Sequence, residues 1–232
     1  MIRLPISGLC ILTVALCASC ANETSEGSDL PAWEPNSLVD SIAAAHGYQQ
    51  WADVDYLRFG FDVSVNDTMR ASRSWLWYPS TDSIVRITDG GEVSYVRNTN
   101  LTAEEEQADQ QFINDSYWVL MPFYGIWSSD GYTSTVRRGV EAPLSKTPMT
   151  MLTVAYAKEG GYTPGDAYDL YVDQDYRLQE WTFRKGGQAA PSMMMSWEGY
   201  RTEGGLLLPT EHNGDGPVVI THPNVEVVLR EG

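Results

Sequence analysis

An alternation of apolar and polar side chains marks the first element that the sequence predicts, over residues 56–65. Every second position of this run is apolar: Leu57, Phe59, Phe61, Val63 and Val65. Because successive side chains of a strand point to opposite faces, the run predicts a strand with one apolar and one polar face. Asn66-Asp67 follows, and a second run carries Trp75 and Trp77 on one face. Together the two runs predict a β-hairpin that opens an antiparallel sheet.

Short strands with similar patterning recur along most of the remaining chain. We expect them at residues 83–88, 92–97, 133–140, 149–157, 167–172, 177–184, 191–201, 218–221 and 225–229. Tight turns such as Asp89-Gly90-Gly91 join neighbours, and strands joined in this way are antiparallel, because parallel strands need long crossovers. An open antiparallel sheet of about ten or eleven strands curls, so its concave side has to be filled.

A first helix is predicted shortly before the hairpin. Ser37 followed by Asp40 resembles a capping box, which satisfies free N–H groups at the start of a helix. Apolar residues then recur at helical spacing as far as His46, and Gly47 is a typical C-terminal stop. The predicted helix is amphipathic, so we expect it to lie against the sheet.

A second helical region lies in the middle of the chain. Thr102 and Glu105 form a capping box at its start. Asn114-Asp115 is predicted to interrupt the helix. The six residues after this interruption predict a second, short helix, which Pro122 stops because proline cannot supply a helical N–H.

The end of this region is crowded with large side chains. Nine apolar or aromatic residues occupy positions 117–127. We expect this element to be buried on most sides; the alternative is an exposed apolar patch that binds a ligand or a membrane. The whole pattern predicts an α+β fold, with a large curled antiparallel sheet and two or three helices that cover its concave side.

The N-terminus predicts export. Residues 1–19 combine a positive charge with an apolar stretch that is too short to span a membrane, which is typical of a signal peptide. The small residues before Cys20 resemble a bacterial lipobox, in which the cysteine is lipidated, and Ala21 after it implies sorting to the outer membrane. The alternative is an ordinary signal peptide that is cut near Ala18 or Ala21.

The rest of the chain is predicted to consist of a tether and one domain. Residues 20–35 are acidic and proline-marked and predict a tether from the lipid anchor, and residues 36–232 predict one domain. All three cysteines lie at positions 10, 17 and 20. The domain therefore has no disulfide, no cysteine-based metal site and no cysteine nucleophile.

The charge of the chain narrows the classes of partner. The sequence has 31 acidic and 15 basic residues, a formal net charge of -16. Binding to nucleic acid requires basic patches, and the sequence shows none. The same charge disfavours electrostatic docking of the domain on anionic lipid.

The sequence contains no recognisable catalytic or metal-binding motif that would identify a reaction. His212 and His222 flank a glycine-rich turn and are expected to be solvent-exposed, while His46 belongs to the apolar stripe of the first helix. Asp173 and Asp175 resemble a calcium loop without its central glycine, so we expect a hairpin turn there. No nucleophile elbow, P-loop or dinucleotide fingerprint occurs. We therefore expect no catalytic residue, no metal and no cofactor.

Taken together, these features resemble the LolA/LolB-like superfamily of periplasmic lipoprotein carriers and outer-membrane acceptors. The resemblance rests on the lipobox-like cysteine, the first helix and the strand ladder, and on two segments, residues 113–123 and 204–210. It covers residues 36–229. It implies a half-open barrel whose hollow side is closed by helices and lined with apolar side chains. In characterised members that hollow receives acyl chains.

The sequence therefore predicts a monomeric envelope lipoprotein that is attached to the membrane through its N-terminal lipid anchor. We expect it to bind an apolar ligand, such as an acyl chain of a lipid or lipoprotein. The expected pocket residues are Leu57, Phe59, Phe61, Trp75, Trp77, Trp118, Leu120, Trp181, Met193, Met195 and Trp197. Two alternatives remain: a structural or interaction lipoprotein with a packed interior, and a hydrolase. A hollow of several hundred Å³ favours the first reading, since ligand pockets occupy about 300–1,000 Å³.

Overall fold

The computed structural model describes residues 37–127, 131–159 and 164–231, which belong to one compact unit, Trp33–Gly232. The predicted signal peptide, Cys20 and the tether lie outside the described residues. Within the described ranges, no helix combines the length and the apolar character needed to cross a membrane.

The first sheet has seven strands in the order β12-β13-β1-β2-β3-β4, with β14 also paired to β1. Their bounds are β1 Val54–Val65, β2 Thr68–Tyr78, β3 Ser83–Thr88, β4 Gly91–Val96, β12 Glu211–Asn213, β13 Val218–Thr221 and β14 Glu226–Leu229. The predicted hairpin is β1–β2, and Asn66 and Asp67 turn it with φ angles of 49° and 59°, as type I′ turns require. The predicted apolar face is also confirmed, because Leu57, Phe59 and Phe61 are at most 2% exposed.

The second sheet has five strands in sequence order, β5-β6-β7-β8-β9. Their bounds are β5 Tyr132–Glu141, β6 Pro148–Tyr156, β7 Ala167–Val172, β8 Leu178–Arg184 and β9 Met193–Ser196. Two isolated bridges, Met195 with Gly214 and Glu198 with Glu211, connect the β9 region to the β12 region. The two sheets thus form one curved antiparallel layer, in which β4 and β5 are the outer strands and each pairs with one neighbour among the described strands.

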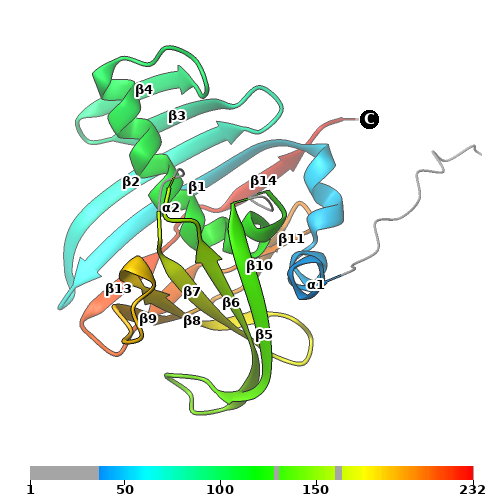
Figure 1. The fold of residues 1–232 in the computed structure, drawn as a ribbon. Helices are drawn as coiled ribbons and strands as arrows, with labels where there is room; N and C mark the ends of the chain where they lie inside the picture. The colour runs from blue at the N-terminus through cyan, green and yellow to red at the C-terminus, as the bar shows by residue number, and fades with distance from the viewer. Residues whose placement is uncertain (1–36, 128–130, 160–163, 232) are drawn as a thin grey trace, which may run out of the picture. The chain divides into compact units, whose positions relative to one another are not determined.

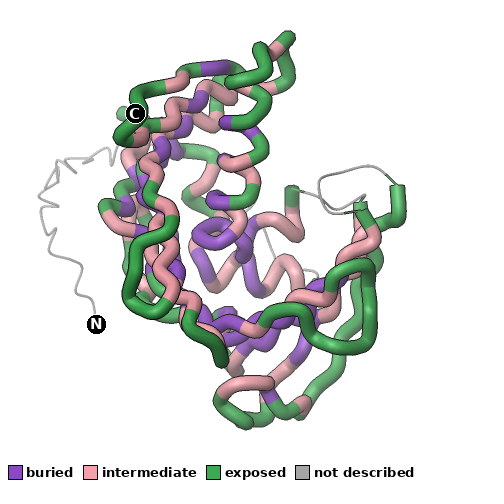
Figure 2. The backbone as a smooth tube through the Cα atoms, turned by 90° about the vertical axis from the view of Figure 1, so that its left-hand side faces the viewer, coloured by how far each residue is buried: buried purple, intermediate pink, exposed green. Residues whose placement is uncertain are grey.

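Helix α2 (Ala103–Trp127) fills the concave side of this layer. It follows β4 and precedes β5, so the chain crosses from one outer strand to the other along this helix (Figure 1). Twenty-five residues at a rise of about 1.5 Å per residue give it a length of about 38 Å. Figure 2 shows the layer curving around the helix, whose lower part is buried. The predicted α+β fold with a curled antiparallel sheet and helices on its concave side is confirmed.

Local sequence signals account for the ends of the helices. Helix α1 (Leu38–Ala45) begins where the Ser37 hydroxyl accepts the Asp40 N–H at 3.1 Å. It ends before Gly47, whose φ of 86° favours glycine, and a Cβ there would lie 2.1 Å from the Gly205 carbonyl oxygen. The second capping box is present too, with the N–H of Thr102 bonded to the carboxylate of Glu105 at 2.7 Å.

The predicted break in the central helix is wrong, because the Asp115 side chain is bound by the sheet rather than by solvent. Asp115 is fully buried, and its carboxylate accepts both N–H groups of a forked Arg73 contact, at 2.6 and 2.9 Å, and the indole N–H of Trp75 at 2.9 Å. Pro122 likewise lies inside α2 instead of stopping it. The crowded segment that follows Asp115 is buried on most sides, as expected, and residues 118–123 are all buried.

The predicted strand over residues 191–201 is also wrong, because the chain turns inside it. It divides into β9 and β10 (Arg201–Glu203), which pairs with β11 (Leu206–Leu208). Gly199 has a φ of 61°, and its carbonyl accepts the hydroxyl of Thr210 at 2.7 Å. A Cβ at this position would lie 2.7 Å from that hydroxyl, so the turn requires glycine. Short strands of this kind raise the number of described strands to 14, above the ten or eleven expected.

Replacing Asp115 with alanine should destabilise the protein by about 3–5 kcal/mol, because Arg73 would keep a largely buried charge without its partner. Urea unfolding measures the change. Glu226→Ala is the control: Glu226 lies 3.7 Å from Arg58, and both side chains are about half exposed. Its loss should cost no more than about 1 kcal/mol. Equal destabilisation by the two substitutions would contradict the importance of the buried contact.

Candidate functional site

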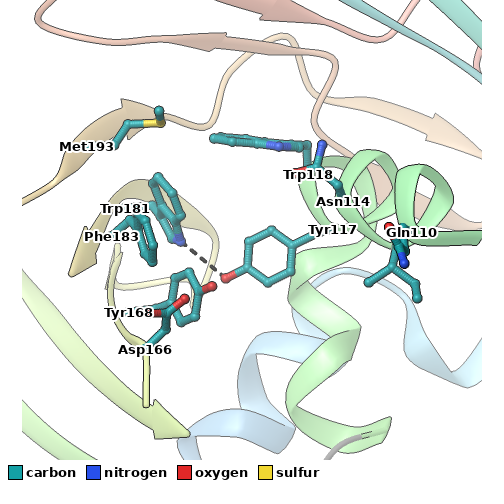
Figure 3. A pocket seen from close by; sticks show the side chains of 10 residues that line it. Gln110, Asn114, Tyr117, Trp118, Asp166, Tyr168, Trp181, Phe183 and Met193 are labelled. Carbon is teal, nitrogen blue, oxygen red and sulfur yellow. Dashed lines mark hydrogen bonds between the residues drawn. The ribbon is translucent and has the colours of Figure 1, made fainter. Parts of the chain in front are cut away.

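A cavity of about 630 Å³ lies between α2 and the second sheet. Its lining, most of which is labelled in Figure 3, consists of Gln110, Ile113, Asn114, Tyr117 and Trp118 from α2, and Asp166, Tyr168, Trp181, Phe183 and Met193 from the sheet side. The volume falls within the range of about 300–1,000 Å³ that ligand pockets occupy. The cavity is therefore the candidate binding site of the described residues.

Three aromatic rings form the sheet wall of the cavity. Tyr168 of β7 is directly paired with Phe183 of β8, and Trp181 lies two residues earlier on β8. Alternation along β8 turns Trp181 and Phe183 to the same face, where their rings lie 6.0 Å apart and 14° from parallel. Tyr168 is within 29° of parallel to both rings, at centroid distances of 5.7 and 5.3 Å. The wall is thus a row of nearly parallel rings.

The helix wall adds Tyr117 and Trp118. The indole N–H of Trp181 donates to the hydroxyl of Tyr117 at 3.2 Å (Figure 3). Burial raises the pKa of Tyr117 well above its ordinary value, so the hydroxyl is neutral at physiological pH. Trp118 is 7% exposed, and its ring packs 5.1 Å from that of Trp181. The interior of the site is therefore aromatic and uncharged.

Polar side chains occur at the mouth of the cavity. Gln110 and Asn114 are exposed on α2. Asp166 directly precedes β7, is partly buried, and its carboxylate accepts the N–H of Gly186 at 2.7 Å. The site is accordingly amphipathic, with a ring-lined interior and a rim of two amides and one carboxylate. Such a lining can bind a hydrocarbon chain and hold a polar end near the surface.

The structure brings three of the eleven sequence-predicted pocket residues to this cavity: Trp118, Trp181 and Met193. The other eight are 0–8% exposed in two packed clusters. Leu57, Phe59, Trp75, Trp77 and Leu120 belong to the first cluster, and Phe61, Met195 and Trp197 to the second. Those eight side chains do not line the 630 Å³ cavity.

Sequence reasoning missed the remaining lining residues. Phe183 shares a face with Trp181 and could have been named on that alternation alone. Identifying Tyr168 as a lining residue requires the register between β7 and β8, which pairs it with Phe183. Gln110 and Asn114 carried no signal, because polar residues on a helix are ordinarily solvated.

The two C-terminal histidines lie beneath the helix wall, and the prediction that they are exposed is wrong. His212 is 0% and His222 3% exposed, because β12 and β13 pair with each other and direct both rings into the layer. Their rings lie 5.4 Å apart. Nδ1 of His212 is 3.0 Å from the carbonyl oxygen of Ser196, and Nδ1 of His222 is 2.9 Å from that of Gly60. These are core histidines that link β12 and β13 to neighbouring backbone.

Burial keeps both rings neutral. Desolvation lowers the pKa of His222 to about 4 and that of His212 well below its ordinary value, and the nearby ring of His222 lowers the latter further. The backbone carbonyl of Trp118 acts on His212 in the opposite direction. This carbonyl is the one that Pro122, lacking an N–H, leaves without its helical partner. The neutral ring of His212 therefore lies beside the part of the helix that contains its proline, 5.3 Å from the ring of Trp118.

Within the described ranges, no group of three or more His, Cys, Asp or Glu side chains is arranged to hold a metal ion. The acidic turn between β7 and β8 is a hairpin turn, as predicted. There the carboxylate of Asp173 accepts the N–H groups of Asp175 and Arg177, each at 2.9 Å. These backbone bonds account for the orientation of Asp173.

Comparison with solved structures finds chains of similar fold. A LolA superfamily protein from Nitrosomonas europaea is 10% identical, with a TM-score of 0.49 and a match over 84% of this chain and 94% of that one. An outer membrane lipoprotein-sorting protein domain from Vibrio parahaemolyticus is 8% identical, with a TM-score of 0.39 over 82% and 93%. No family model and no curated protein matches the sequence.

The buried histidines should make stability depend on pH. The pKa of His222 is about 4 when folded and 6.5 when unfolded, so the unfolded chain binds more protons between these values. Stability should therefore be highest above pH 6.5 and fall as the pH decreases toward 4, with about 3 kcal/mol of the loss due to His222. Urea unfolding at pH 7 and 4.5 should show a smaller loss in His222→Asn, whatever its stability at pH 7. An identical loss in both proteins would contradict this prediction.

Proposed function

We propose that this protein is an envelope lipoprotein that binds an acyl chain in the cavity between α2 and strands β7–β9. The observation that carries the proposal is the 630 Å³ cavity with aromatic walls on the concave side of the curved layer. A packed interior, which is the alternative, would leave no volume of this size. The role is one of binding rather than catalysis, and it requires no metal or cofactor.

The chemistry of the walls supports a hydrocarbon ligand. Tyr168, Trp181 and Phe183 present nearly parallel rings, a broad apolar surface that makes no directional demand on the ligand. Burial of apolar surface contributes about 0.8 kcal/mol for each methylene. A chain of many methylenes gains affinity in proportion to its buried length, whereas a small polar substrate would find few partners inside. The exposed amides of Gln110 and Asn114 can meet the polar end of the ligand at the mouth.

The N-terminal sequence supports a location of this binding at a membrane. We propose that Cys20 carries the lipid anchor and that residues 20–35 space the domain from the outer membrane, on its periplasmic side. In this setting the ligand is an acyl chain of a lipid or of a lipoprotein, and the role belongs to lipid or lipoprotein trafficking.

Blocking the cavity should abolish binding. Met193 lines the cavity and is 38% exposed, so Met193→Trp adds bulk at its edge. We expect the affinity for a fluorescent acyl probe to fall at least about tenfold, which corresponds to about 1.4 kcal/mol. Met69→Trp is the matched control, since Met69 is a 53% exposed methionine of β2 that does not line the cavity, and it should leave affinity unchanged.

Two results would contradict the proposal. One is equal weakening by the two tryptophan substitutions, which would place the probe elsewhere. The other is a protein that carries no lipid when purified from an envelope, as judged by native mass spectrometry, and that also fails to take up the probe. The second result would favour the structural or interaction lipoprotein.

The proposed anchor is tested separately. Cys20→Ser removes the thiol that lipidation requires, so the protein should move from the membrane fraction to the soluble envelope fraction. Cys17→Ser, three residues earlier, is the matched control and should stay with the membrane. Retention of the Cys20→Ser protein in the membrane fraction after a high-salt wash would contradict lipidation at this position.

A further inference from the structure

The mouth of the cavity carries a single carboxylate that no cation neutralises among the described residues. Asp166 lines the cavity, and its carboxylate accepts one backbone N–H, from Gly186 at 2.7 Å. None of the ion pairs within 4.0 Å in the described part of the chain includes Asp166. The N–H of Gly186 fixes the direction of the carboxylate and leaves its negative charge in place.

Two arginines next to lining residues, Arg184 beside Phe183 in the sequence and Arg73 bound to the neighbour of Asn114, are paired with other carboxylates. Arg184 follows Phe183 on β8, so its side chain starts from the opposite face of the strand. There it forms a forked contact with Asp169, with two N–O distances of 2.9 Å. Arg73 forms the corresponding contact with Asp115. No arginine or lysine belongs to the lining, so nothing in it offers a counter-charge to an anionic ligand.

We infer that this cavity selects acyl ligands by the charge of their polar end, and that it takes chains whose end is uncharged, as in an ester or amide, over chains that end in a free carboxylate. This inference rests on the proposed function and names the class of ligand. A carboxylate at the mouth would meet Asp166 with the same sign of charge, partly shielded from water. An ester or a hydroxyl can instead exchange hydrogen bonds with Gln110 and Asn114.

The test compares two ligands with the same tail and different ends. Glycerol monolaurate and laurate compete with a fluorescent neutral acyl probe, below their micelle-forming concentrations, at pH 8 and low salt. The protein is the full chain purified from the envelope and freed of bound lipid. We expect laurate to bind at least about tenfold more weakly than glycerol monolaurate. Because exposed charges are screened by salt, the ratio should narrow at 1 M salt.

A matched pair of substitutions assigns the effect to one side chain. Asp166→Asn keeps an oxygen that accepts the Gly186 N–H and removes the charge, so the ratio of the two affinities should move toward one. Asp175→Asn makes the same change in net charge in the exposed turn after β7, at the other end of that strand from Asp166, and should leave the ratio as in the unsubstituted protein.

The possible results of these binding measurements distinguish the charge selection from the proposed function. Equal binding of both ligands, or a ratio that Asp166→Asn leaves unchanged, overturns the charge selection while the proposed function stands. Equal effects of the two asparagine substitutions would assign selection to the net charge of the protein and would also overturn the role of Asp166. Failure of the neutral probe and of both ligands to bind the folded protein overturns the proposed function and this inference together.

Discussion

The contact between Asp115 of α2 and the β2 strand is the constraint on which the arrangement of this domain depends. A fully buried carboxylate that accepts hydrogen bonds from Arg73, Trp75 and the Asn114 amide has one position in which all these partners are met. A second ion pair, Arg97 with Asp109 at 2.8 Å, connects an earlier turn of the helix to the residue that follows β4. The face of α2 toward the first sheet is therefore attached by charged contacts in addition to apolar packing, such as that of Phe112 on Phe59 and Trp75.

The opposite face of α2 is attached in a different way. There the contacts to the second sheet are mainly aromatic, such as the packing of Trp118 on Trp181. Two neutral hydrogen bonds accompany them, from the indole N–H of Trp181 to the Tyr117 hydroxyl and from the Tyr132 hydroxyl to the Gly125 carbonyl. The 630 Å³ cavity lies on this side of the helix.

Much of the fold could be predicted because its signals are local. The alternation in β1, the turn at Asn66 and Asp67, and both capping boxes depend on residues within a few positions of one another. The continuity of α2 could not be predicted, because the partner that allows a carboxylate in its middle lies 42 residues away. Burial of His212 and His222 could not be predicted for the same reason, since it depends on the pairing of β13 with β12 and with β1.

The site was harder to predict than the fold. Periodicity shows which side chains share a face, and it does not show whether another side chain or a space lies opposite them. Phe59 and Trp181 look alike in this respect, yet Phe59 packs against Phe112 of α2, while Trp181 reaches the cavity. The difference lies in which α2 side chains oppose each sheet, and these contacts join residues that are far apart in the sequence.

The connection between the outer strands has a mechanical consequence. Because α2 joins β4 to β5, the free edges of the layer are tied to opposite ends of one rod of about 38 Å. A hydrogen-bonded helix does not stretch, so this spacer limits how far the edges can separate. The central helix therefore restricts changes in the curvature of the layer that encloses the cavity.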